Sequence, residues 1–132
     1  NYKGSPIAIE FKYDPDPPGG KNQAKTHKAG AVFRDIHRLL LAGEATRADC
    51  YFVYLTTKEM AVYFANPQNR HHDYFGLQPN SSLSIKTDYF SGRPMTFMTS
   101  LGGEFEAKLT CVVSRPVSSE HSLRVYRVGA IQ

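Results

Sequence analysis

Glu10 and Lys12 are the residues whose types and spacing first suggest chemistry, because they interrupt the apolar stretch PIAIEFKY at 6–13. Successive side chains of a strand point to opposite sides, so Glu10 and Lys12 share one face. The other face would carry Ile7, Ile9, Phe11 and Tyr13. Such a pair has two interpretations. It lies on the solvated face of an antiparallel strand whose apolar face is buried, or it points into the crevice where α/β sheets bind ligands.

The segments that follow this strand favour the second interpretation. Residues 14–22, DPDPPGGKN, form a loop. Apolar residues at helical spacing predict a helix over 26–42, ended by Gly43. The run CYFVYL at 50–55 is apolar on both sides, which is typical of a central parallel strand covered by helices. A helical crossover between the two strands would place the first one inside a parallel or mixed sheet.

The rest of the chain predicts a second helix and further strands. Thr56 and Glu59 match a capping box that opens a helix over 57–65, and 66–81 is expected to be a long surface loop. Strands are expected at 82–88, 104–114 and 123–129, with an irregular segment over 89–103. We therefore predict one domain, 1–132, of the α/β (α+β) class with a mixed sheet flanked by helices.

Composition indicates a globular and mildly basic domain. The 132 residues carry 16 Lys and Arg against 12 Asp and Glu, a net charge of +4, which is compatible with a polyanionic partner without requiring one. Cys50 and Cys111 lack the spacing of a metal site, and we expect buried thiols in a reducing, cytoplasmic protein, with a single disulfide as the alternative. No apolar run is long enough for a membrane span, and G-x-S-x-G and G-K-[ST] are absent. The chain starts at Asn1, so we expect the natural protein to have a further N-terminal segment.

The order of IEFKY, a turn-rich loop, the helix containing FRDIHRL and the aromatic strand CYFVYLT carries a resemblance to a known family. Residues 5–66 resemble the core of the PD-(D/E)XK nuclease-like superfamily, which has the restriction-endonuclease-like fold. The E-x-K triplet of that superfamily is here Glu10-Phe11-Lys12. Residues after 66 match no pattern of this family.

The resemblance implies metal-dependent hydrolysis of phosphodiester bonds, with DNA as the expected substrate. Glu10 would hold Mg²⁺ or Mn²⁺, the main-chain carbonyl of Phe11 would supply another ligand, and Lys12 would orient or activate the attacking water. Mg²⁺ needs few protein ligands because it keeps several waters and takes up phosphate oxygens. Such an ion neutralises charge on the phosphate and acidifies its bound water, and an ammonium stabilises developing negative charge.

One part of the family pattern is missing from this sequence. The family has an acidic residue, normally Asp, on the strand before the E-x-K strand, and NYKGSPIAI at 1–9 contains neither Asp nor Glu. Either this Asp lies before the first residue, which we favour, or the domain is a non-catalytic relative. Asp14 and Asp16 are expected to be turn formers in a Pro-rich loop, not replacements.

Four basic residues are candidate contacts to nucleic acid. Arg34 and Arg38 lie four apart in the predicted helix, so they would either contact a nucleic-acid backbone together or form a solvated charge cluster with Asp35. Lys25 and Lys28 would either hold phosphates beside the site or increase solubility.

A second polar segment, RHHD at 70–73, lacks the spacing of a zinc site, and its histidines are expected to have no metal role. With Tyr74 and Phe75, the same loop is a candidate for stacking on nucleic-acid bases.

Three functions are therefore open for this sequence. The first is a Mg²⁺-dependent DNA endonuclease, with which a homodimer is compatible. The second is a nucleic-acid- or protein-binding module that has kept the nuclease-like fold without its activity. The third is an unrelated α+β domain in which Glu10 and Lys12 form a structural pair.

Overall fold

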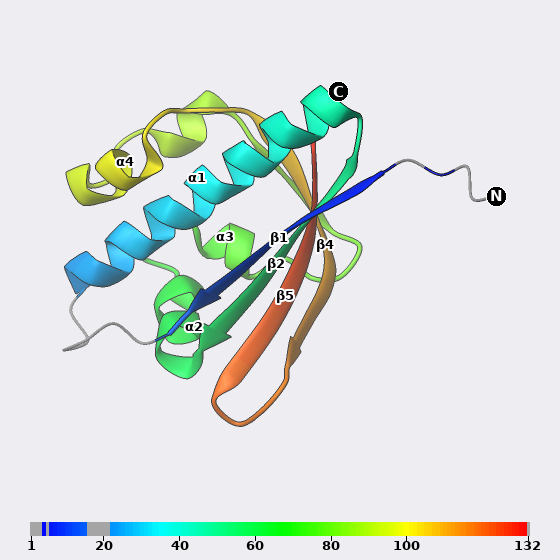
Figure 1. Ribbon diagram of the computed structural model, residues 1–132. Helices are drawn as coiled ribbons and strands as arrows, with labels where there is room; N and C mark the ends of the chain where they lie inside the picture. The colour runs from blue at the N-terminus through cyan, green and yellow to red at the C-terminus, as the bar shows by residue number, and fades with distance from the viewer. Residues whose placement is uncertain (1–3, 5, 16–21, 132) are drawn as a thin grey trace.

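The computed structural model describes residues 4, 6–15 and 22–131, and it is a mixed α/β domain built on one sheet of five strands. Figure 1 shows the helices on one side of that sheet. The elements in chain order are β1 Ile7–Asp14, α1 Asn22–Thr46, β2 Asp49–Thr57, α2 Lys58–Ala65, α3 His72–Phe75, β3 Ser82–Ile85, the 3-10 helix η2 Thr87–Phe90, α4 Met95–Leu101, β4 Ala107–Pro116 and β5 His121–Gly129.

The sheet is mixed, with the strand order β1-β2-β5-β4-β3. Strands β1 and β2 are parallel and are joined by α1, which confirms the predicted helical crossover. All other neighbouring strands are antiparallel. The expectation that the first strand lies inside the sheet was wrong for the described residues, because β1 pairs with β2 alone and forms an edge.

In the part of the chain that the structure describes, helices cover only one face of the sheet (Figure 1), and this decides which side chains of β1 and β2 are buried. Burial alternates along β2, so the prediction of a strand covered on both faces was wrong. Phe52 and Tyr54 point into the core below the helices, whereas Tyr51 and Val53 lie half-buried on the other face. On β1 the alternation is reversed from the usual pattern: the apolar set faces outward and the charged set faces the helices.

Helix α1 is longer than predicted because Gly43 does not end it. The helix continues through Gly43 to Thr46, and a Cβ at position 43 would collide with the Sγ of Cys50 on β2. This glycine therefore permits close packing of the helix on the sheet. Gly30 has the same role on the other side of α1, where a Cβ would collide with the main-chain oxygen of Phe97 in α4.

The segment between β2 and β4 is more ordered than its sequence suggested. Residues 66–81 contain α3, and 89–103 contain α4. The predicted capping box is absent, because Thr56 is a buried strand residue and α2 starts after Thr57. These helices complete a core of aromatic rings around Phe33, which contacts Tyr74, Tyr89, Phe90 and Phe97.

Cys50 and Cys111 are buried free thiols, as predicted. In the described ranges, no helix is both long and apolar enough to cross a membrane.

Candidate functional site: the charged seam between β1 and α1

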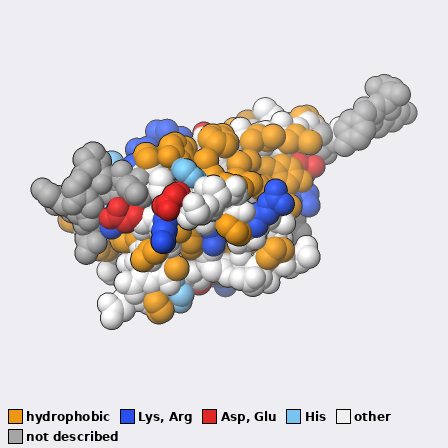
Figure 2. All heavy atoms as spheres, turned by 90° about the horizontal axis from the view of Figure 1, so that it is seen from below, with side chains coloured by type: hydrophobic (Ala, Val, Ile, Leu, Met, Phe, Trp, Pro, Cys, Tyr) orange, Lys and Arg blue, Asp and Glu red, His pale blue; other side chains and the backbone are white. Residues whose placement is uncertain are grey.

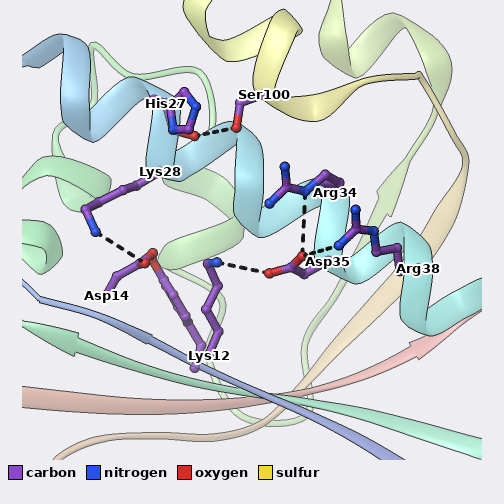
Figure 3. A network of polar contacts seen from close by, with 9 residues as sticks. Lys12, Asp14, His27, Lys28, Arg34, Asp35, Arg38 and Ser100 are labelled. Carbon is purple, nitrogen blue, oxygen red and sulfur yellow. Dashed lines mark hydrogen bonds and ion pairs between the residues drawn. The ribbon is translucent and has the colours of Figure 1, made fainter.

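The charged face of β1 meets α1 in a row of acidic and basic side chains that we call the β1–α1 seam: Glu10, Lys12, Asp14, Lys28 and Asp35. Figure 3 shows Lys12 and Asp14 pointing from β1 toward side chains of α1. The sequence produces this arrangement because residues 10, 12 and 14 are two apart in a strand and share the face that α1 covers. The prediction that Glu10 and Lys12 do not lie on a freely solvated face is confirmed.

Lys12 is bound by Asp35 at the middle of the seam. Its Nζ donates to Oδ2 of Asp35 at 3.0 Å, and both side chains are mostly buried. Arg34 and Arg38 each lie 3.8 Å from Oδ1 of the same carboxylate. Asp35 therefore forms ion pairs with three basic side chains (Figure 3). The cluster of Arg34, Arg38 and Asp35, one of the two alternatives for this helix, is present.

Asp14 is the most buried member of the seam, with 3% of its surface exposed. The hydroxyl of Tyr54 donates to its Oδ2 at 2.6 Å, and Nζ of Lys28 lies 3.9 Å from Oδ1. Thr56 is the register partner of Asp14 on β2, and its buried hydroxyl has no hydrogen-bond partner among the described residues. Burial raises the pKa of the Asp14 carboxyl, although Tyr54, Lys12 and Lys28 act to lower it.

Asp14 is the functional candidate that sequence reasoning missed. It was taken for a turn former because it opens the Pro-rich stretch DPDPPGG, but β1 extends through it. The signal that could have found it is the continuation of the period of two, which turns E-x-K into E-x-K-x-D on one strand face. Asp16 lies outside the described residues.

Glu10 differs from the other two charged residues of β1. It is half-buried on the helix-facing side, and among the described residues it forms no hydrogen bond or ion pair. Lys12 and Asp14 are both held by neighbouring side chains, so Glu10 is the member of the seam whose carboxylate is left to accept a ligand.

The four basic candidates are placed differently with respect to the seam. Lys28 belongs to the seam and Arg34 borders it, and both are partly exposed. Arg38 projects from the seam with 67% of its side chain exposed. Lys25 is buried and binds Oε1 of Glu59 on α2 at 2.7 Å. The side chain of Lys25 is thus used in joining α1 to α2.

The RHHD segment lies at the surface through Arg70, His72 and Asp73, but the rings expected to stack on bases do not. Tyr74 and Phe75 are buried in the core, and His71 is buried against Phe97. Arg93 donates to Nδ1 of His71, and burial together with the charge of Arg93 lowers the pKa of His71 to about 3. The proposed stacking role of Tyr74 and Phe75 was therefore wrong.

Among the described residues, the seam offers a cation one unpaired carboxylate, that of Glu10. No three His, Cys, Asp or Glu side chains come together around one point within the described ranges. Glu10 and Asp14 are four residues apart on a strand, a separation of about 13 Å, so they do not share one ion directly. Mg²⁺ is commonly held by one or two carboxylates plus waters and phosphate oxygens, and Glu10 can supply such a carboxylate.

The chain was compared with protein-family models, with curated proteins and with solved structures, and no match was found in any of the three. The superfamily resemblance of residues 5–66 thus stays a prediction.

Proposed function

We propose that this domain is a metal-dependent phosphodiesterase of the nuclease-like type, with DNA as its substrate. The observation that carries the proposal is the state of Glu10. It is a half-buried carboxylate without a partner among the described residues, next to Lys12 on the same face of a strand that leads through a helix into a parallel neighbour.

In this proposal Glu10 and the main-chain carbonyl of Phe11 hold Mg²⁺ or Mn²⁺, which when bound supplies charge neutralisation at the phosphate and a more acidic water. Lys12 places its ammonium beside that position and stabilises negative charge on the phosphate oxygens. Asp35 supports this role because its carboxylate accepts a hydrogen bond from the Lys12 ammonium and fixes its direction. Arg38 and Lys28, at the two ends of the seam, supply contacts to the nucleic-acid backbone.

A second candidate function is a binding module without hydrolytic activity. The observation that favours it is the pairing of Lys12 with Asp35, since an ammonium neutralised in this way is less available to a substrate. In the binding module the exposed Arg38 and the partly exposed Lys28 bind phosphates, while Glu10 has no catalytic role.

The experiment that separates the two candidates is cleavage of supercoiled plasmid with Mg²⁺, Mn²⁺ or EDTA by the chain and by Glu10→Ala and Lys12→Ala. The matched controls are Glu44→Ala and Lys86→Ala, which remove the same charges from exposed positions outside the seam. We expect metal-dependent nicking that falls at least about 100-fold in both seam variants and stays within about twofold in both controls. Circular dichroism checks that each variant is folded.

Absence of cleavage on plasmid, single-stranded DNA and RNA, together with absence of Mn²⁺ binding by calorimetry, would overturn the hydrolytic proposal. Retention of salt-dependent DNA binding that weakens in Arg38→Ala would then establish the binding module.

A further inference from the structure

The uncovered face of the sheet carries a continuous set of apolar side chains, which we call the outer apolar patch. Register pairing places its members side by side across three strands: Phe11 lies opposite Val53, which lies opposite Val125. Figure 2 shows hydrophobic side chains gathered in a band on one side of the molecule. The patch consists of Ile7, Ile9, Phe11 and Tyr13 on β1, Tyr51, Val53 and Leu55 on β2, and Leu123 and Val125 on β5.

The patch is large enough to require an explanation. The exposed fractions on β1 are 60% for Ile7, 66% for Ile9, 60% for Phe11 and 45% for Tyr13. With a fully exposed side chain of this size taken as about 200 Å², these four residues alone present roughly 450 Å². The half-buried residues of β2 and β5 extend this area toward the roughly 800 Å² that one partner buries in a standard protein interface. Monomers rarely expose apolar patches larger than about 300–600 Å².

The chemistry of the patch selects an apolar partner over nucleic acid. None of its members is charged, and the charged side chains of the same face border the patch: Arg127 lies opposite Tyr51 and binds Asp49, and Arg115 lies opposite Leu123. Nucleic-acid surfaces combine aromatic rings with cations along the backbone path, whereas here Ile7 and Ile9 are among the most exposed members of the patch. Enrichment in aliphatic and aromatic residues and depletion of charge are the features of a homodimer core.

We propose that the outer apolar patch is the interface of a homodimer, in which two copies of this chain pack their sheets face to face about a two-fold axis. An isologous interface brings the same patch from both copies together, so an uncharged apolar patch is complementary to itself without any compensating charge. The packing is that of a two-layer β-sandwich, with α1 and its seam on the outer side of each copy. This inference does not depend on the proposed phosphodiesterase activity.

The test is the mass of the chain in solution, measured by light scattering and sedimentation between about 1 and 100 µM, the range in which a micromolar complex dissociates. We expect a species of twice the 14.8 kDa monomer mass at the upper concentration. Ile9→Lys and Phe11→Lys should raise the dissociation constant at least about tenfold, because a charge would be buried at the centre of the interface. Val62→Lys is the matched control, since Val62 is 63% exposed on α2, outside the patch, and it should leave the constant within about twofold.

Several results would overturn the proposal. A chain that stays monomeric at about 100 µM contradicts it whatever the variants do. Dimers that persist in both Ile9→Lys and Phe11→Lys would place the interface elsewhere. If Val62→Lys raises the dissociation constant as much as these variants do, the effect of an added lysine is not specific to the patch. Thermal unfolding of each variant at low concentration shows whether it is folded before its mass is interpreted.

Discussion

The two faces of β1 reverse the usual pattern of a strand, in which apolar side chains face the core and charged side chains face solvent. Toward α1 the strand presents Glu10, Lys12 and Asp14, and toward the uncovered side it presents isoleucine and aromatic side chains. The alternation itself is the ordinary period of two, so the sequence fixes which residues share a face but not which face a helix covers. The comparison teaches that charge can lie on the packed side of an edge strand where partners compensate its burial, as Asp35 does for Lys12 and Tyr54 for Asp14. Glu10, which has no such partner among the described residues, stays only half-buried.

The largest expected difference between the two sides of the sheet concerns removal of an aromatic ring. Phe52→Ala removes a fully buried ring on the helix-facing side and should lower the free energy of unfolding by about 3–5 kcal/mol. Phe11→Ala removes an exposed ring on the outer side and should cost less than about 1 kcal/mol. Urea unfolding followed by circular dichroism, at a dilution where light scattering detects only monomer, measures both. Comparable losses in the two variants would show that the outer face is covered in the monomer.

The second largest difference in stability is expected between two ion pairs on opposite faces of the sheet, Lys12–Asp35 and Arg127–Asp49. Lys12→Met removes the 3.0 Å bond to Asp35 and should cost about 1–3 kcal/mol, because a mostly buried carboxylate loses its closest donor. Arg127→Met removes a bond of 3.2 Å to Asp49, but these side chains are 57% and 43% exposed, so the loss should stay below about 1 kcal/mol. Equal unfolding free energies for the two variants in urea would contradict the buried position of the seam.

Two tyrosines of β2 extend the comparison to hydrogen bonding. Tyr54→Phe removes the hydroxyl that donates to Asp14 at 2.6 Å and should lower the unfolding free energy by about 1–2 kcal/mol, since Asp14 is left buried with weaker support. Tyr51→Phe makes the same chemical change on the outer face and should alter stability by less than about 0.5 kcal/mol. Thermal unfolding of both variants beside the parent chain provides the measurement, and a larger loss for Tyr51→Phe would be the contrary result.

Much of the fold could be predicted because local patterns agreed with it. The spacing of apolar residues located α1, the run at 50–55 located β2, and their order predicted the parallel crossover. Patterns could not show how many faces of β2 are covered, because half-buried and buried apolar residues look alike in a sequence. They also placed 66–81 on the surface, although its Tyr74 and Phe75 fill the core, since a short helix without periodicity leaves no signal.

The candidate site was partly predictable for the same reason. Glu10 and Lys12 stood out because they break an apolar run, and their shared face followed from the period of the strand. The carboxylate that Lys12 meets could not be chosen from the sequence, because the relative rotation of helix and strand is a tertiary property. Asp14 was assigned to the loop because Pro-rich residues follow it, so the strand was predicted to end one residue too early.

The smallest expected effect is the pH dependence that Asp14 adds to stability. Burial raises its folded pKa above 3.8, so in the window above pH 3.8 the folded protein keeps a proton that the unfolded chain has lost. Stability then falls as pH rises through that window, with a slope of at most about 1.4 kcal/mol per pH unit for one proton. Asp14→Asn cannot ionise and lacks this component, while its amide oxygen still accepts from Tyr54.

The measurement is the difference in unfolding free energy between the parent chain and Asp14→Asn across this window. The difference is needed because His71, with its pKa lowered to about 3, acts in the opposite direction and destabilises both proteins as pH falls below 6.5. We expect the parent chain to lose stability relative to Asp14→Asn as pH rises. If it gains instead, attraction to Lys12 and Lys28 outweighs burial, and Asp14 is an ordinary ion-paired carboxylate of the seam.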